Sequence, residues 1–475
     1  MFATLFGRFN KTSELTRERA GQPSNKCQTR VDFKFYKLNI HFTSFILHTF
    51  ANMVLRLFLF ISIIVLVEYY FYQALKNIID FKHHRLISIL EGAWIGVLVL
   101  IIISIFPYQP HQWHDFFRIF LSIVAIIEIS KIFGSLFMLL DDLRRWFILC
   151  FYYIQKLFAL KENPFSTGIS RSQFLSQLAV YFTFIPFIGF IYGIIKGAYN
   201  FKIHSVKLEF EELPKNFDGL KIVQISDLHL GSFFSTQPVE KIVELVLAEK
   251  PDIICFTGDL VNNITDEVLP YLSLLKKLKA PLGVYSILGN HDYGDYIHWD
   301  SKDEKQKNLQ RLIQIQRQCG WDILLNEHRI IEKGNQQIAL IGVENWGGNL
   351  HFPRYGKLDK AYQGTEHLPF KLLLSHDPSH WDLEVSKKYP DIQLTLSGHT
   401  HGFQFGVEYK NIRFSPVQWV YKQWAGLYKK THLQSSTEKQ QFLYVNRGAG
   451  FIGYPGRLGI WPEITVIELF HKNNG

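Results

Sequence analysis

The segment Gly398-His399-Thr400-His401-Gly402 follows a short apolar strand that we predict over residues 392–396. Its two histidines are one residue apart and lie between glycines, so both imidazole rings can face one point beyond the strand end. Two imidazoles at one point suit a metal ion. Alone, the motif is weak evidence, because a His-x-His pair more often belongs to a solvated turn.

Four earlier strands that we predict end in side chains of the same kind. They are residues 221–226, 252–257, 283–288 and 371–374, and they lead into Asp227-Leu228-His229, Gly258-Asp259, Gly289-Asn290-His291-Asp292 and Ser375-His376-Asp377. In α/β folds, ligands collect beyond the carboxyl ends of the strands. We therefore expect these metal ligands to converge: Asp227, His229, Asp259, Asn290, His376, His399 and His401.

This ligand set suits the cleavage of phosphate esters. That reaction needs neutralised phosphoryl oxygens, hydroxide near neutral pH and an in-line leaving group, all of which two metal ions ~3.5–4 Å apart can supply. Asp259 suits the shared, bridging carboxylate. Mixed imidazole and oxygen ligands favour Mn, Fe, Zn or Co over calcium or magnesium.

The five motifs, in this order, resemble the calcineurin-like metallophosphoesterase superfamily, and more closely its bacterial transmembrane proteins with a metallophosphoesterase domain. The resemblance covers roughly residues 207–470, with no ligand position missing. It implies an α/β metallophosphoesterase domain of two packed mixed β-sheets flanked by helices, an α/β/β/α sandwich. The metals would lie at one edge of that sandwich.

Carried over by position, the resemblance implies two metal sites that share Asp259. One would be completed by Asp227, His229 and His401, and the other by Asn290, His376 and His399. His291 would lie outside the metal shell, where it stabilises the phosphoryl oxygen or protonates the leaving group. Asp292 would orient the His291 ring by accepting its second N–H. Asn262 and Asn263 occupy the place where the family has Asp or Asn after its Gly-Asp pair.

The chain divides by composition into three parts. We expect residues 1–52 to be a basic arm, either disordered or untranslated, because Met53 precedes an apolar run and is a plausible start. Residues 53–200 are expected to form an N-terminal α-helical membrane domain, and residues 201–475 the metallophosphoesterase domain. The four cysteines are scattered without a CxxC motif, so no disulfide framework or zinc knuckle is expected.

The membrane domain is predicted from four predominantly apolar stretches of about 20 residues, the length that crosses a bilayer. They are residues 55–75, 86–106, 116–140 and 179–199. Residues 146–160 are shorter and more polar, so we predict an interfacial helix there; if this segment crosses the membrane instead, the topology inverts. Glu128 and Lys131 are spaced to pair on one face of the third span, which favours a structural role over a functional one.

We expect the chain to lie in the plasma (inner) membrane, and we predict its orientation from the charges of its loops. Loops one and three carry more lysine and arginine than loop two, so the positive-inside rule puts the catalytic domain on the extracytoplasmic side. The arm before Met53 would favour the opposite orientation. The net charge of +9 is explained by these loops and by anionic lipids, and we expect no binding to duplex nucleic acid.

Further residues are candidates for contact with substrate or membrane. Arg447 and Arg457 lie in glycine-rich loops and are predicted to bind the phosphate of the substrate, with packing of the loop on its own sheet as the alternative. Trp346, Phe451 and Tyr454 are candidates for an apolar rim. The aromatic segment 418–428 is predicted to touch the membrane surface.

Three functions remain open from the sequence. The first is hydrolysis of a lipid-linked phosphoester or pyrophosphate such as UDP-2,3-diacylglucosamine in lipid A biosynthesis, with membrane lipids as neighbours and manganese among the possible ions; that substrate requires a cytoplasmic site. The second is a tethered general phosphatase or phosphodiesterase with soluble substrates. The third is a non-catalytic membrane signalling protein, which the complete ligand set disfavours.

Overall fold

The computed structural model of the chain describes residues 55, 58–104, 114–157, 169–348, 352–410, 412–434 and 437–472. The basic arm predicted over residues 1–52 lies outside the described residues. The chain divides into two compact units, with boundaries after Gly96, Gly134 and Val180. From Tyr181 onward, the last apolar helix therefore belongs to the same unit as the α/β domain.

Four helices within the described residues are long and apolar enough to cross a membrane, which agrees with the four predicted spans. The first runs over Phe58–Ile78. The other three are α3 (His84–Ser104), α4 (His114–Leu157) and α5 (Ile169–Ile195). Most of their leucine, isoleucine and phenylalanine side chains are exposed, as expected of surfaces that face lipid.

The prediction of a separate interfacial helix over residues 146–160 is wrong, because α4 continues through that segment to Leu157. No glycine or proline interrupts residues 136–157. Asp141 also supports the continuation, since its carboxylate accepts from Arg144 at 2.8 Å and Arg145 at 2.8 Å, one helical turn ahead. In the third span, Lys131 lies 3.8 Å from Glu128, which confirms the predicted pair.

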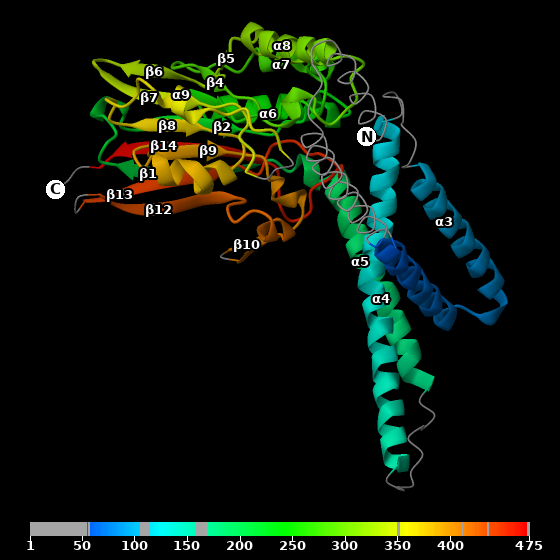
Figure 1. The fold of residues 1–475 in the computed structure, drawn as a ribbon. Helices are drawn as coiled ribbons and strands as arrows, with labels where there is room; N and C mark the ends of the chain where they lie inside the picture. The colour runs from blue at the N-terminus through cyan, green and yellow to red at the C-terminus, as the bar shows by residue number, and fades with distance from the viewer. Residues whose placement is uncertain are drawn as a thin grey trace, which may run out of the picture. The chain divides into compact units, whose positions relative to one another are not determined.

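The α/β domain contains two six-stranded mixed sheets (Figure 1). The first sheet has the order β1-β14-β2-β3-β4-β5, in which β2 to β5 are parallel and β14 is antiparallel to β2. The bounds of its strands are β1 (Lys202–Phe210), β2 (Leu220–Ile225), β3 (Ile253–Phe256), β4 (Val284–Ser286), β5 (Asp322–Ile323) and β14 (Glu463–His471).

The second sheet has the order β12-β13-β9-β8-β7-β6. Strands β7, β8, β9 and β13 are parallel, and an antiparallel strand pairs at each edge. Its strands are β6 (Glu327–Lys333), β7 (Gln336–Gly342), β8 (Lys371–Leu374), β9 (Leu394–Ser397), β12 (Gly426–Gln434) and β13 (Thr437–Val445). A separate two-stranded hairpin joins β10 (Val407–Tyr409) and β11 (Ile412–Phe414).

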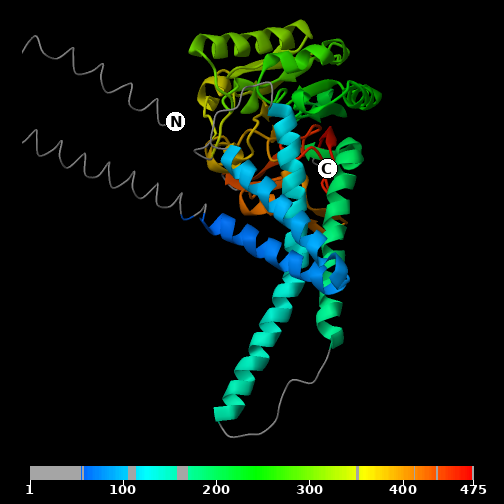
Figure 2. The same ribbon diagram turned by 90° about the vertical axis from the view of Figure 1, so that its right-hand side faces the viewer.

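Side-chain alternation along the strands produces four layers. Val223 and Ile254 of the first sheet pack against α6 (Gln237–Ala248), α7 (Leu272–Leu275) and α8 (Lys302–Gln318), seen in green in Figures 1 and 2. Alternate residues such as Ile222 and Ile253 pack between the sheets against Leu372. The far face of the second sheet packs against α9 (Leu358–Tyr362) and the turn that precedes α10 (Ser386–Lys388). The predicted α/β/β/α sandwich is therefore confirmed.

Candidate metal centre

The five predicted strands are present, and the predicted ligands follow their carboxyl ends. In the first sheet, β2 leads to Asp227 and His229, β3 to Asp259, and β4 to Asn290. In the second sheet, β8 leads to His376, and β9 leads to His399 and His401. Because the strands that bear the ligands run parallel within each sheet, these loops lie at one end of the sandwich.

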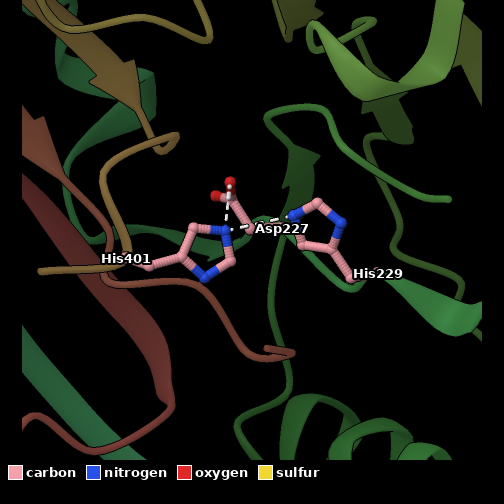
Figure 3. A group of neighbouring side chains, drawn as sticks. All are labelled: Asp227, His229 and His401. Atoms are coloured by element: carbon pink, nitrogen blue, oxygen red, sulfur yellow. Dashed lines mark hydrogen bonds and ion pairs between the residues drawn. The ribbon is translucent and has the colours of Figure 1, made fainter. Parts of the chain in front are cut away.

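The first group consists of Asp227, His229 and His401, whose donor atoms all lie within 4.8 Å of one another (Figure 3). His401 Nε2 is 3.1 Å from Asp227 Oδ1 and 3.1 Å from His229 Nε2. Asp227 and His229 are fully buried and His401 is nearly so. Two imidazole nitrogens and a carboxylate that face one point in a buried position form a typical divalent metal site.

The second group consists of Asp259, His376 and His399. His376 Nε2 lies 3.2 Å from Asp259 Oδ2, 3.2 Å from Asn290 Oδ1 and 3.3 Å from His399 Nδ1. Asp259 Oδ2 is also 3.6 Å from His229 Nε2 of the first group. One carboxylate oxygen is therefore placed between the two groups, as a bridging ligand requires.

The backbone at these positions is unusual. Five of the ten non-glycine residues with positive φ in the described part of the chain are predicted ligands: Asp227, His229, Asp259, His399 and His401. A left-handed conformation is uncommon outside glycine, although Asp and His adopt it more readily than most residues, and residues held in it concentrate at functional sites. At Gly398, a Cβ atom would clash with the Ser226 hydroxyl and the Asp227 carboxylate, so only glycine allows this approach of the two loops.

The second nitrogen of three histidines has an acceptor, which fixes the ring orientation. His229 Nδ1 lies 3.1 Å from Asn262 Oδ1, His376 Nδ1 is 2.7 Å from the Thr257 carbonyl, and His399 Nε2 is 2.8 Å from the Tyr421 hydroxyl. If these nitrogens donate, the other nitrogen of each ring presents a lone pair to its group. Such outer partners are typical of metal-ligating histidines, so the residues fit a pair of divalent ions.

Electrostatics agrees with that fit. Burial lowers the pKa of His229 and of His399, so both imidazoles are neutral near pH 7, as ligands must be. Burial acts to lower the pKa of His376 as well, but the Asp259 carboxylate beside it raises that pKa to about 10. A metal ion that binds His376 would therefore displace a proton.

His291 lies beside the two groups without belonging to either. Its backbone N–H donates to Asp259 Oδ1 at 2.8 Å, and its ring packs edge-on against His229 with centroids 4.9 Å apart. Its Nδ1 is 2.8 Å from the carbonyl oxygen of Asn262. That contact assigns the proton to Nδ1 and leaves Nε2 as the atom able to accept or deliver a proton.

The prediction that Asp292 orients the His291 ring is wrong, because the Asn262 carbonyl has that place. Asp292 is fully buried and instead accepts from backbone N–H groups of Asp259, Leu260 and Gly289, each at 2.8 or 2.9 Å. Burial and the nearby Asp259 carboxylate raise the pKa of Asp292 to about 7. Asp292 therefore joins the loop that carries Asp259 to the loop that carries Asn290.

A cavity of about 550 Å³ opens onto the two groups. Asp259, Asn290, His291, His399 and His401 line its polar part. Its remaining lining is mostly apolar or aromatic: Phe352, Phe403, Val417, Val420, Tyr421, Ile452 and Tyr454, with Thr400 and Gln404. Of the three residues predicted to rim the entrance, Tyr454 lines the cavity, whereas Trp346 and Phe451 are buried.

Arg447 and Arg457 are buried and occupied by protein acceptors, which favours the packing alternative over contact with substrate. Arg447 forms ion pairs with Glu463 and Glu408. Arg457 donates to the carbonyl oxygens of Arg447 at 2.8 Å and Gly450 at 2.6 Å, and its Nη2 lies 3.3 Å from His401 Nδ1. Both guanidinium groups therefore hold the glycine-rich loop behind the first group of ligands.

We expect Arg447→Met to destabilise the domain by about 3–5 kcal/mol, because it leaves the Glu463 carboxylate buried without its cationic partner. Burial opposes ionisation of Glu463, but Arg447 holds its pKa at about 2. The measurement is the midpoint of thermal unfolding in detergent. Lys472→Met, which removes an exposed ion pair with Glu211, is the matched control and should change stability by about 0–1 kcal/mol. Unchanged stability with a raised KM would restore Arg447 as a substrate-binding residue.

Tyr421 is a site residue that the sequence did not reveal. It belongs to the segment 418–428 that we predicted to touch the membrane surface, and within that segment the Tyr421 hydroxyl bonds to His399 Nε2 and its ring lines the cavity. It follows the short helical turn Pro416–Trp419, 22 residues beyond His399. An aromatic residue in a loop carries no signal for this role, because only the fold brings it to the ring.

Tyr421→Phe should lower affinity for the ion held by His399 about 10- to 100-fold, the usual cost of losing an outer partner of a metal-ligating histidine. The measurement is competition of the purified protein with a fluorescent metal chelator. Tyr409→Phe, which removes an exposed hydroxyl from the same part of the chain, is the control. Equal affinity in the two variants would contradict the role of Tyr421.

Comparison with known proteins agrees with this geometry. Residues 53–198 match the family described as probable calcineurin-like phosphoesterase, transmembrane domain, and residues 220–403 match calcineurin-like phosphoesterase. An uncharacterised metallophosphoesterase of Bacillus subtilis, YkuE, is 32% identical over 57% of this chain and 85% of its own length. A transmembrane protein with a metallophosphoesterase domain from Danio rerio is 29% identical over 59% of this chain.

The chain spans 60% of the length of the Danio rerio relative. Among solved structures, the alignment with the phosphopantetheinyl hydrolase PptH of Mycobacterium tuberculosis covers 42% of this chain and 89% of the PptH chain. The sequence identity is 16% and the TM-score is 0.25. The four apolar helices and the match to a transmembrane domain make this chain a membrane protein. By the match to YkuE, the family matches and its two His/Asp groups, the chain belongs to the calcineurin-like phosphoesterase family.

Proposed function

We propose that the chain is a membrane-anchored phosphoesterase that works with two divalent metal ions. The observation that carries the proposal is the position of Asp259 between two buried groups of His and Asp, at the floor of a cavity. Asp227, His229, Asp259 and His401 would hold one ion, and Asp259, Asn290, His376 and His399 the other. Because the donors are a mixture of nitrogen and oxygen, we propose that the two ions are Mn, Fe, Zn or Co.

When bound, the two ions would neutralise charge on the phosphoryl oxygens and lower the pKa of water. The chain's own residues position and protonate the reacting groups. Asn262, Thr257 and Tyr421 hold three imidazoles in the orientation that directs one nitrogen to each group. His291, fixed through Nδ1 by the Asn262 carbonyl, has Nε2 available to protonate the leaving group or to stabilise a phosphoryl oxygen.

For the substrate, we propose a lipid-linked phosphoester or pyrophosphate. The apolar and aromatic part of the cavity supports this class, because it can accommodate hydrocarbon next to the polar site that binds phosphate. Attachment to the membrane keeps the domain near such molecules. UDP-2,3-diacylglucosamine is one member of the class, but it requires a cytoplasmic site, whereas the loop charges favour the extracytoplasmic side of an inner membrane.

The test is ³¹P NMR of a membrane-lipid extract incubated in Mn²⁺-containing detergent with the full chain or its Asp259→Asn variant. Loss of a lipid phosphorus signal with the unmodified chain alone would establish the class of substrate and the bond cleaved. An unchanged spectrum, with hydrolysis of a small soluble diester retained, would assign soluble substrates. If the lipid phosphorus signals are unchanged and the soluble diester is not hydrolysed either, the proposed activity is overturned.

A further inference from the structure

The hairpin of β10 and β11 has its apolar face on the outside. In its register, Val407 pairs with Phe414 and Tyr409 with Ile412, so these four side chains share one face. All four are exposed, between 40% and 65%. An antiparallel ribbon on a soluble domain normally turns its polar face outward, so this hairpin presents the reverse arrangement.

The opposite face of the hairpin is polar and turned toward the domain. Glu408 and Arg413 form the remaining cross-strand pair. Glu408 accepts from the buried Arg447 at 2.6 Å, and Arg413 donates to the carbonyl oxygen of Ala425. These bonds fix which face points outward, because turning the hairpin over would leave Arg447 without one of its two carboxylates.

The apolar surface continues into the next turn. Trp419 is 74% exposed and packs edge-on against Phe414, with ring centroids 5.9 Å apart, and Val420 is 60% exposed. We call Val407, Tyr409, Ile412, Phe414, Trp419 and Val420 the hairpin patch. Two exposed lysines, Lys410 and Lys422, lie beside it in the sequence. Aromatic and aliphatic side chains with neighbouring lysines are the composition of surfaces that enter the headgroup region of a membrane.

The segment that leads into the hairpin is attached to the last membrane helix. Phe405 stacks on Phe190 of α5 with ring centroids 5.6 Å apart. The N–H of Arg457 donates to the carbonyl oxygen of Gly193 at 3.1 Å, and Gly406 donates to Leu458 at 2.9 Å. Phe190 is about 8 Å along the helix axis from the last residue of α5, Ile195. The hairpin thus starts near the end of a helix that is long and apolar enough to cross a membrane, which is where the bilayer surface is expected.

We infer that the hairpin patch docks on the surface of the bilayer that α5 crosses, with Lys410 and Lys422 placed among anionic headgroups. Val420 belongs to the hairpin patch and also lines the cavity. Its neighbour Tyr421, which is not part of the patch, lines the cavity too. Docking therefore places the mouth of the cavity at the headgroups. This last step rests on the proposed function: a lipid-linked phosphoester would reach the metal centre without leaving the bilayer.

The test measures accessibility and does not depend on turnover. A nitroxide label is attached at Ile412→Cys, or at Ile330→Cys as the matched control, in full chains whose Cys27 and Cys150 are replaced by serine. Ile330 is also an exposed isoleucine, at 43%, and lies on β6 at the edge of the second sheet. The chains are reconstituted in nanodiscs of phosphatidylcholine and phosphatidylglycerol. Collision of the label with oxygen, which concentrates in lipid, is compared with collision with a water-soluble nickel complex.

We expect the ratio of oxygen to nickel accessibility to be several-fold higher at position 412 than at position 330. Equal ratios would overturn the inference, because both labels would then lie in water. A label at 412 that is shielded from both reagents would also overturn it, since the patch would then be covered by protein. The Asp259→Asn variant should give the same ratios, which separates docking from the proposed hydrolysis.

Discussion

Asp259→Asn is expected to lower the occupancy of both metal sites together. Asp259 Oδ2 lies between His229 and His376, while Oδ1 accepts from the backbone N–H of His291. An asparagine cannot fill both roles, because its NH₂ group either faces the ions without a lone pair or opposes the His291 N–H. The loss of charge at a shared ligand weakens the binding of both ions. Every other proposed ligand belongs to one group, so its substitution would weaken the binding of one ion.

The measurement is metal content by mass spectrometry after dialysis of the full chain in detergent, with hydrolysis of a soluble diester as the second readout. Asp303→Asn is the control, since Asp303 is an exposed carboxylate on α8 that pairs with Lys307. We expect fewer than two equivalents of metal and no detectable turnover in Asp259→Asn, against full values in the control. Two full equivalents in Asp259→Asn would exclude the bridging role.

His291→Ala is expected to lower kcat by ~10²–10⁴-fold, the usual effect of losing a general acid or base. Metal content should be unchanged, because His291 belongs to neither group of converging donor atoms. The structure adds a reason for a large effect. The Asn262 carbonyl and the His229 ring hold the imidazole beside the two groups, so the substitution removes an acid–base group that is already positioned.

The test combines steady-state kinetics on a soluble diester with metal analysis of the same sample. His367→Ala, which removes an exposed histidine that does not line the cavity, is the control and should retain activity. Loss of metal in His291→Ala would show that His291 is a ligand. Retained activity with retained metal would show that the leaving group is protonated by another group.

The positions of the proposed ligands at the strand ends were predictable because they depend on local rules. Each ligand follows an apolar strand within a few residues, and parallel strands bring their carboxyl ends to one edge of a sheet. Apolar stretches of membrane-spanning length also located, in outline, the four apolar helices. The prediction of an interfacial helix over residues 146–160 failed, because Asp141 and its two arginines stabilise one helix that continues from the third span to Leu157.

The outer contacts of the site were not predictable, because they join residues far apart in the chain. His291 was paired with its sequence neighbour Asp292, but the structure gives that place to the carbonyl of Asn262, 29 residues earlier. The sequence left substrate binding and loop packing both open for Arg447 and Arg457, since an arginine beside glycines has the same sequence pattern whether its partner is a phosphate or a buried carboxylate. Only the fold brings Glu463 and Glu408 to Arg447.

The sequence by itself determined the family, the membrane segments and the identity of the proposed metal ligands, because these follow from periodicity and from motifs at strand ends. The tertiary structure decided that Asp259 lies between the two groups, that Tyr421 holds His399, and that the apolar face of the hairpin points outward. Each of these depends on the direction of side chains from separate strands and loops, which is fixed only when the two sheets pack together.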